Sequence, residues 1–204
     1  MKSKIIALIV LAIDIAMVVM ERKVYFPWSG PMQLRFYTNS SNVLAMFVCV
    51  ICAVTGAVCL IFGIDMPRWA QILRYVAACC LMVTFIVAAC ILVPLDPGAT
   101  FKGFMLKGGN LFVHTLCPLL MLASFLISGG EPLTVKHAAM AVIPTVIYGV
   151  VTIVMVSKRV YSAPYFFFRV TQQPWYETVK WMAVIVGGNF AVSWLLTKAQ
   201  LRIR

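Results

Sequence analysis

The sequence predicts an all-α integral membrane protein, built as one polytopic bundle of six transmembrane helices. Hydrophobic residues make up 63% of the 204 residues and charged residues 11%, whereas a soluble domain has about 25% charged residues. Six apolar runs approach the roughly 20 residues that a helix needs to cross a bilayer. The 17 Lys and Arg residues, which contribute to a net charge of +11, gather at the ends of these runs, where lipid head groups lie.

The first apolar run covers residues 5–20 and follows Lys2 and Lys4. It contains Asp14, and no small-residue cleavage site precedes Glu21, so we interpret it as a retained helix and not as a signal peptide. The other runs cover residues 42–64, 72–93, 111–127, 138–156 and 179–196. Segments rich in turn-forming residues separate them, at residues 27–31, 65–67, 96–98, 129–132 and 164–174. Residues 1–204 are therefore expected to form a single membrane domain.

The charge pattern gives an orientation and excludes some partners. Basic residues are almost evenly divided between the two ends of the expected bundle, but the end with both termini has shorter segments and fewer acidic residues. We therefore expect a bacterial inner-membrane protein with cytoplasmic termini. No basic stripe with interleaved aromatic residues occurs, so we expect membrane lipids and no nucleic acid as partners. The sequence does not indicate an oligomeric state.

Alternating crossings place the starts of the second, fourth and sixth helices at the end opposite the termini. A polar cluster of residues 38–42 immediately precedes the second run, and His114 lies about one turn into the fourth, after Asn110. At about 1.5 Å per residue, His114 is only slightly below the interface at which the polar cluster lies. A hydroxyl group and an imidazole can therefore share one pocket.

Two interpretations of this juxtaposition are open. An imidazole can take a proton from a hydroxyl and return it to a leaving group, and a hydroxyl is a poor nucleophile without such a base. In the structural alternative, residues 38–42 cap the second helix and His114 bonds to a neighbouring helix. Asp14 is open in the same way, because it can orient His114 or remain neutral and bonded within the bundle.

Other polar residues within the runs have structural explanations. Asn189 is expected to form an interhelical hydrogen bond. Cys49 and Cys52 form a C-x-x-C pattern, but they lie inside a membrane helix, where cysteine behaves as a small apolar residue. His114 and His137 lie near opposite ends of the bundle. We therefore expect no metal ion and no cofactor.

Several segments together resemble a known family. Residues 36–42 (Phe-Tyr-Thr-Asn-Ser-Ser-Asn) resemble the Thr-x-x-Ser-Asn signature of small bacterial six-helix relatives of the androgen-induced-gene family. Residues 110–118 resemble that family's fourth-helix His followed by a helix-interrupting Pro. Tyr148 and residues 161–166 resemble its later Tyr and Tyr-Pro-Phe elements. The likeness extends over nearly the whole chain in order and spacing.

This resemblance implies an activity. The eukaryotic family, which also includes the androgen-dependent regulator of tissue factor pathway inhibitor, consists of multi-pass hydrolases that use a Thr and a His to cleave fatty acid esters of hydroxy fatty acids. By resemblance, Thr38 is the nucleophile and His114 its general base, acting on such an ester or a related lipid ester. The expected oxyanion or substrate-binding residues are Ser41, Asn42, Asn110, Arg35, Tyr148 and Tyr165. Lys107 and Arg169 are further candidates for holding a substrate carboxylate, or they anchor the helices at the interface.

Two other function classes remain as alternatives. A small transporter or channel would use Asp14 as a coupling site and residues 38–42 as an entrance. A non-catalytic assembly subunit would use small-residue faces such as Ala53 and Ala57.

Overall fold

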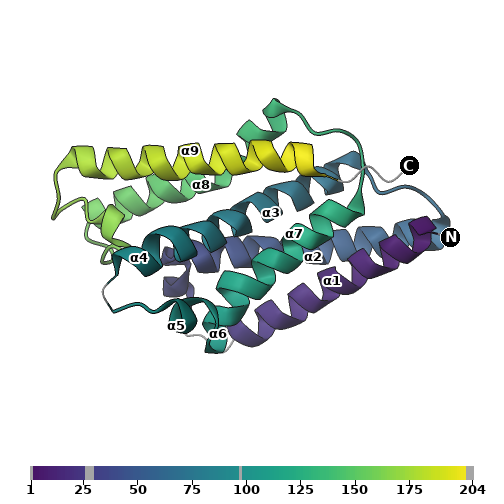
Figure 1. Ribbon diagram of the computed structural model, residues 1–204, viewed down its shortest axis with the longest axis horizontal. Helices are drawn as coiled ribbons and strands as arrows, with labels where there is room; N and C mark the ends of the chain where they lie inside the picture. Colours follow the sequence, from purple (N-terminus) through teal and green to yellow (C-terminus); the bar gives the residue numbers. More distant parts are fainter. Residues whose placement is uncertain (1, 26–29, 97, 201–204) are drawn as a thin grey trace.

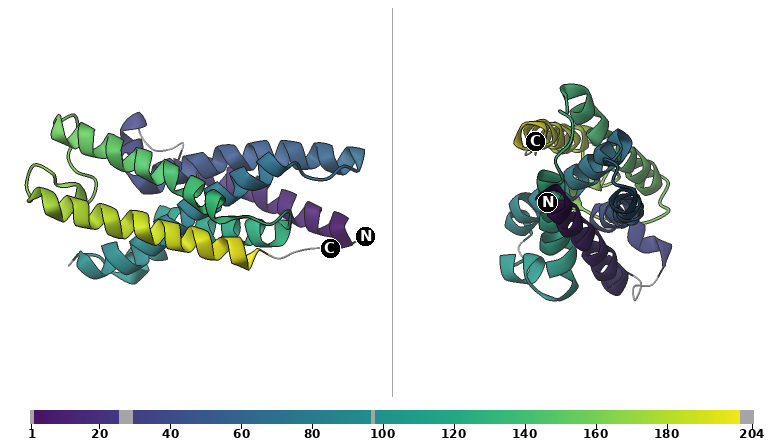
Figure 2. Two further views of the ribbon diagram at one scale, coloured as in Figure 1. Left: turned by 90° about the horizontal axis from the view of Figure 1, so that it is seen from above. Right: turned by 90° about the vertical axis from the view of Figure 1, so that its right-hand side faces the viewer.

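The computed structural model describes residues 2–25, 30–96 and 98–200, and these residues form a bundle of helices without a strand. The predicted all-α class is confirmed. The long helices run roughly along one axis, and the start of α1 (Lys2–Tyr25) and the end of α9 (Trp175–Ala199) lie at the same end of the molecule (Figure 1). Two further views show the same elongated bundle (Figure 2).

Among the described residues, five helical stretches are long and apolar enough to cross a membrane, so the chain is an integral membrane protein. They are α2 (Tyr37–Phe62), the continuous stretch Arg68–Leu95, the stretch Gly108–Ser128, α8 (Val135–Ser157) and α9. The first predicted span, residues 5–20, lies in α1, which has 24 residues but is not among the five. Its apolar sequence is interrupted by Asp14 and Glu21. A sixth crossing therefore stays a prediction.

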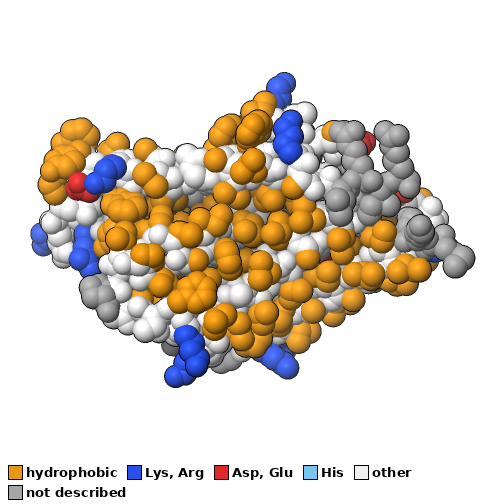
Figure 3. Space-filling model, in the orientation of Figure 1, with side chains coloured by type: hydrophobic (Ala, Val, Ile, Leu, Met, Phe, Trp, Pro, Cys, Tyr) orange, Lys and Arg blue, Asp and Glu red, His pale blue; other side chains and the backbone are white. Residues whose placement is uncertain are grey.

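The third helix is the centre of the bundle. The stretch Arg68–Leu95 consists of α3 (Arg68–Val87), η2 (Ala88–Leu92) and α4 (Val93–Leu95), and α3 contacts α2, α7 (Cys117–Ser128), α8 and α9. α1 packs in the angle between α2 and α7. Hydrophobic side chains cover the face shown in Figure 3, with Lys and Arg at its edges, as a lipid-facing surface requires.

The helices extend beyond their apolar runs, and this corrects one prediction. α2 begins at Tyr37, so residues 38–42 form its first two turns and do not precede it. Phe36 has an extended backbone and supplies no side-chain cap. Instead, the polar side chains bond to the preceding turn: Asn39 donates to the Gln33 carbonyl oxygen and Ser40 to that of Leu34. Hydropathy detects contact with lipid, whereas the helix continues through the polar interface.

Two π-helical turns each end two residues before a proline. η2 precedes Pro94, and η3 (Phe112–Leu116) precedes Pro118. Proline has no N–H for the carbonyl four residues earlier, so a regular α-helix loses a bond there. In η3 the Cys117 N–H instead reaches back five residues to the Phe112 carbonyl. Such bulges occur frequently at functional sites, and η3 contains His114.

Short elements cover the end of the bundle opposite the termini. They are η1 (Pro31–Arg35), α5 (Phe101–Met105), α6 (Gly108–Leu111) and η4 (Phe166–Phe168). The sequence predicts none of them, because each is too short to show hydrophobic periodicity. They supply several of the groups described next.

Candidate functional site

Thr38 and His114 lie in direct contact. Thr38 Oγ1 is 3.2 Å from His114 Nε2, a distance compatible with a nucleophile and its base. Both side chains are buried, with exposed fractions of 9% for Thr38 and 6% for His114. The first turn of α2 and the π turn η3 therefore bring together two residues that are 76 positions apart.

A backbone carbonyl assigns the direction of this hydrogen bond. His114 Nδ1 lies 3.1 Å from the Phe104 carbonyl oxygen, which only accepts, so Nδ1 carries the proton. Nε2 of the neutral ring is then an acceptor, and the Thr38 hydroxyl donates to it. The Phe104 ring also stacks on the imidazole, with 4.8 Å between the ring centroids. His114 is thus held in the orientation and tautomer that a general base needs.

Asn110 contributes to this support. Its side-chain amide donates to the Gly103 carbonyl oxygen, and the Thr115 hydroxyl donates to that of Met105. Together with the bond from His114 to Phe104, these contacts fix α5 against η3. Asn110 therefore has a structural contact here, and its role in binding substrate stays a prediction.

The Tyr165 hydroxyl also contacts Thr38. It accepts from the Thr38 backbone N–H at 3.4 Å and lies 3.5 Å from Thr38 Oγ1. Because first-turn amides have no partner within their helix, this contact uses a donor that is otherwise free. Burial raises the pKa of Tyr165, so the hydroxyl stays protonated and can donate.

Ser41 and Asn42 were predicted as oxyanion donors, but the structure gives them another role. The Asn42 side-chain amide donates to the carbonyl oxygens of Thr38, at 2.7 Å, and Val113, at 3.1 Å. Ser41 bonds to the Thr38 carbonyl and to the Thr84 hydroxyl. Both donor hydrogens of Asn42 are occupied, so these residues hold the backbone of Thr38 and join α2 to η3 and α3.

Arg35 and Tyr148 also lie near the site, and their role in binding substrate stays a prediction. The Tyr148 hydroxyl donates to the Arg35 carbonyl, while the Arg35 guanidinium lies 4.9 Å from the centroid of the Phe36 ring. The ring of Tyr148 packs edge-on against that of Tyr37. The contribution of Tyr148 to the site is thus its ring, which lines the pocket described below.

A polar chain leads from the site across the bundle. The Tyr37 hydroxyl is 2.7 Å from Thr145 Oγ1, which also accepts from the Asn189 side-chain amide. Ser193 in turn donates to Asn189 Oδ1. The predicted interhelical hydrogen bond of Asn189 is therefore present, and it ties α9 to α8 and, through Tyr37, to α2.

Asp14 does not orient His114. Its carboxylate forms a two-pronged ion pair with Arg74, both N–O distances being 2.8 Å, and accepts a further bond from Ser124. Arg74 also donates to Ser124. A buried charge requires such a partner, and the second turn of α3 provides it on the side of the termini. The prediction of an orienting carboxylate is corrected, because the Phe104 carbonyl occupies that place.

A largely apolar pocket opens beside Thr38. The space within it, counted together with the open region at its mouth, is about 720 Å³. Five lining residues carry a hydroxyl group, and among them Thr38 lies against Tyr165 and Tyr37 against Thr145: Tyr37, Thr38, Thr84, Thr145 and Tyr165. The remaining wall comes mainly from apolar side chains of α3, α8, α9 and η4. His114 is absent from the lining, so Thr38 lies between the base and the pocket.

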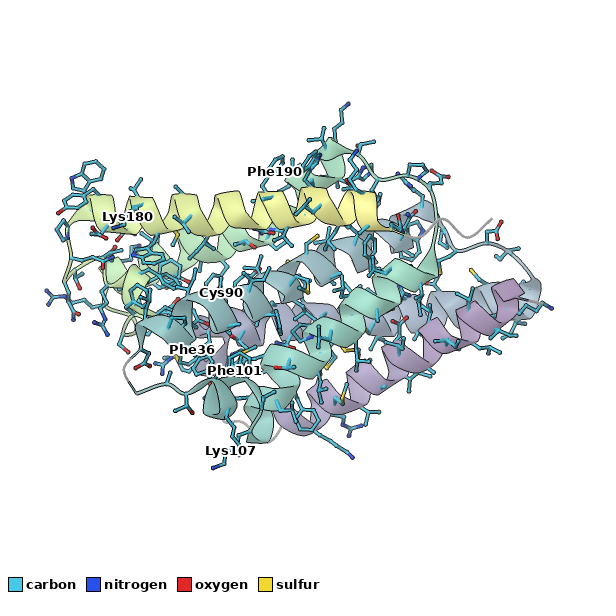
Figure 4. The ribbon with its side chains drawn as sticks, viewed as in Figure 1. Phe36, Cys90, Phe101, Lys107, Lys180 and Phe190 are labelled. Atoms are coloured by element: carbon cyan, nitrogen blue, oxygen red, sulfur yellow. The ribbon has the colours of Figure 1, made fainter. Side chains whose placement is uncertain are left out.

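Other predicted groups lie apart from Thr38. Lys107 projects outward from the bundle (Figure 4), and Arg169 is exposed beside a second, polar hollow together with Arg159. His137 completes a capping box with Thr134 at the start of α8. Cys49 and Cys52 are buried free thiols. Within the described part of the chain, no cluster of three or more His, Cys, Asp or Glu residues is arranged to hold a metal ion.

Three groups at the candidate site were not predicted from the sequence: the Phe104 carbonyl and the hydroxyls of Thr84 and Thr145. The Phe104 carbonyl has no sequence signal, since every residue has such a group. Thr84 and Thr145 face the site from predicted spans, and a hydroxyl inside a span is a weak signal that was available.

The comparisons with known proteins give no relative. No model of a known family, no curated protein and no solved structure matches this chain. The resemblance to the androgen-induced-gene family therefore stays a prediction.

Proposed function

We propose that this protein is an intramembrane hydrolase that cleaves a lipid ester, with Thr38 as the nucleophile and His114 as the general base. The observation on which the proposal depends is the bond from Thr38 Oγ1 to His114 Nε2, with His114 Nδ1 anchored on the Phe104 carbonyl. A nucleophile, a base and a group that orients the base are the arrangement that activates a hydroxyl.

Acylation follows from this geometry. His114 Nε2 takes the Thr38 proton while Oγ1 attacks the ester carbonyl carbon. The bond between that carbon and the alcohol oxygen breaks, and His114 returns the proton to the departing alcohol. Water then attacks the acyl-Thr38 ester, and His114 takes one of its protons. Collapse releases the carboxylic acid, and the proton held by His114 returns to Thr38.

The negative charge that forms on the carbonyl oxygen needs a donor. Tyr165 is suited to this role, because its hydroxyl accepts from the Thr38 N–H and keeps its own hydrogen to donate. Its position within 3.5 Å of Oγ1 is compatible with an oxygen bound to the same carbon as Oγ1.

The pocket supports a lipid substrate. Thr38 and Tyr165 line it, and its otherwise mostly apolar lining suits a hydrocarbon chain. Fatty acid esters of hydroxy fatty acids, or a related lipid ester, have this combination of a polar linkage and apolar chains.

The test is hydrolysis of a palmitic acid ester of hydroxystearic acid by purified protein in vesicles. Thr38→Ala and His114→Ala should each lower kcat at least about 10²-fold, whereas Thr38→Ser keeps a hydroxyl and should retain part of the activity. Ser40→Ala is the matched control, because its hydroxyl bonds to the Leu34 carbonyl. A fluorophosphonate probe should label the wild type and not Thr38→Ala. Full hydrolysis by either alanine variant contradicts the dyad, and solute flux without ester cleavage would favour the transporter class instead.

A further inference from the structure

The pocket beside Thr38 extends from the bundle interior to its outer surface. Thr38, Thr145 and Gly149 are buried at its inner part, whereas Val146 and Val150 on the same wall have exposed fractions of 41% and 56%. The pocket therefore has a mouth at the exposed face of α8. α8 packs side by side with α9 in both views of Figure 2, and α9 supplies the opposing wall.

The level of this mouth determines what enters it. Val146 lies midway along α8, which has the length and composition of a membrane span. Residues around the midpoint of a spanning helix face the hydrocarbon core, where water is scarce. A group that enters at Val146 and Val150 thus comes from the acyl-chain region of the bilayer.

One glycine keeps the passage open. Gly149 lies on the pocket wall, and a Cβ added there would meet the Met182 sulfur of α9 at 3.5 Å, an ordinary contact. A larger side chain at this position would have room only by extending into the pocket. Gly149 therefore leaves the space between α8 and α9 free for a chain of methylene groups.

We infer that the pocket is a lateral acyl-chain channel: a lipid enters from the bilayer core past Val146 and Val150, lies along Gly149, and presents its polar linkage to Thr38. The inference deepens the proposed hydrolase function and rests on it for the fate of that linkage. The burial of the lining supports this direction, because the polar residues Thr38, Thr84 and Thr145 are buried. The apolar residues Val146 and Val150 are exposed. Gly149 is then a residue that determines how bulky a chain is accepted.

The test uses a photoactivatable palmitic acid analogue in phosphatidylcholine vesicles, followed by mapping of the cross-linked residues by mass spectrometry. We expect cross-links to the pocket-facing residues of α8 and α9, and competition by unlabelled palmitate. Gly149→Leu displaces about three methylene groups of the bound chain, so labelling should fall at least about tenfold. Val150→Trp at the mouth should also lower the labelling, and it changes only an exposed position.

Matched controls separate blockage from misfolding. Gly188→Leu makes the same substitution in α9 where a Cβ would meet nothing within 4 Å, and Val154→Trp lies one turn from Val150 outside the pocket. Both should label as the wild type does. Labelling that Gly149→Leu and Val150→Trp leave unchanged overturns the channel. Thr38→Ala should still be labelled, so loss of hydrolysis and loss of chain binding are distinguished.

Discussion

The Tyr165→Phe substitution is the sharpest test of the proposed oxyanion donor. It removes one hydroxyl and leaves the aromatic packing, because the ring of Tyr165 stacks on Phe167 at a centroid distance of 5.1 Å and meets Phe36 edge-on. The Thr38–His114 bond is not touched by the change. A reduction in rate therefore reports the hydroxyl and not a collapse of the site.

The magnitude follows from the contacts of that hydroxyl. Removal of one oxyanion donor typically lowers kcat by about 10²- to 10³-fold, or about 2.7–4 kcal/mol. In the resting structure the hydroxyl is 3.5 Å from Thr38 Oγ1 and 3.4 Å from the Thr38 amide, both at the long end for hydrogen bonds. We therefore expect the lower end, about 10²-fold in kcat, with little change in KM.

The assay is steady-state hydrolysis of the palmitoyl hydroxystearate ester, together with a denaturant titration of each variant. Tyr75→Phe is the matched control, since its buried hydroxyl donates to the Ser193 carbonyl at 2.6 Å, away from Thr38. It should lose about 1 kcal/mol of stability and keep kcat. If Tyr165→Phe keeps the wild-type kcat, or only raises KM, Tyr165 does not stabilise the oxyanion.

The pH dependence gives a second check. Burial raises the pKa of Tyr165, so its proton is bound more tightly in the folded protein than in the unfolded chain. This contribution to stability is complete below the ordinary tyrosine pKa of about 10 and is lost as the pH rises through the higher folded value. Activity should consequently show no loss from Tyr165 ionisation below about pH 10. A wild-type activity loss below that pH which Tyr165→Phe abolishes would contradict this.

Two further substitutions test the framework of the site. Asp14→Asn leaves Arg74 buried without its ion pair and should lower the free energy of unfolding by about 3–5 kcal/mol. The double variant Asp14→Leu/Arg74→Met removes both charges and should recover much of that loss. Additive losses in a denaturant titration would contradict the ion pair. Pro118→Ala restores an N–H that can bond to the His114 carbonyl, so η3 should relax toward an α-helix. Thermal stability should then rise and ester hydrolysis should slow. Unchanged hydrolysis would show that the π turn is not needed.

The fold class and one contact were within reach of the sequence. Apolar runs fix the depth of each residue, because a spanning helix advances about 1.5 Å per residue, and alternating crossings decide which helix starts meet. These two rules are enough to place Thr38 near His114, and the structure gives 3.2 Å between their polar atoms. The start of α2 was misplaced, since Tyr37 to Asn42 are helical but not apolar.

The identity of the supporting groups was largely out of reach. The Phe104 carbonyl comes from α5, a five-residue helix in a connection that hydropathy does not resolve. The ion pair of Asp14 had a usable signal, because Arg74 falls inside the third apolar run and charges within spans pair with one another. The general pattern of Lys and Arg at the ends of the apolar runs hides this exception.

The apolar interior of the bundle explains why a backbone carbonyl, and not a carboxylate, lies beside His114. A carboxylate in the apolar bundle needs a permanent counter-charge, as Asp14 has in Arg74. A carboxylate beside His114 would gain an opposite charge only when the ring is protonated, and it would be unpaired while the ring is neutral. The neutral Phe104 carbonyl fixes the same ring nitrogen without that cost, but it stabilises the protonated imidazole less. A hydrolase built in this way is expected to turn over slowly, and to depend correspondingly more on Tyr165 and on a chain held beside Thr38.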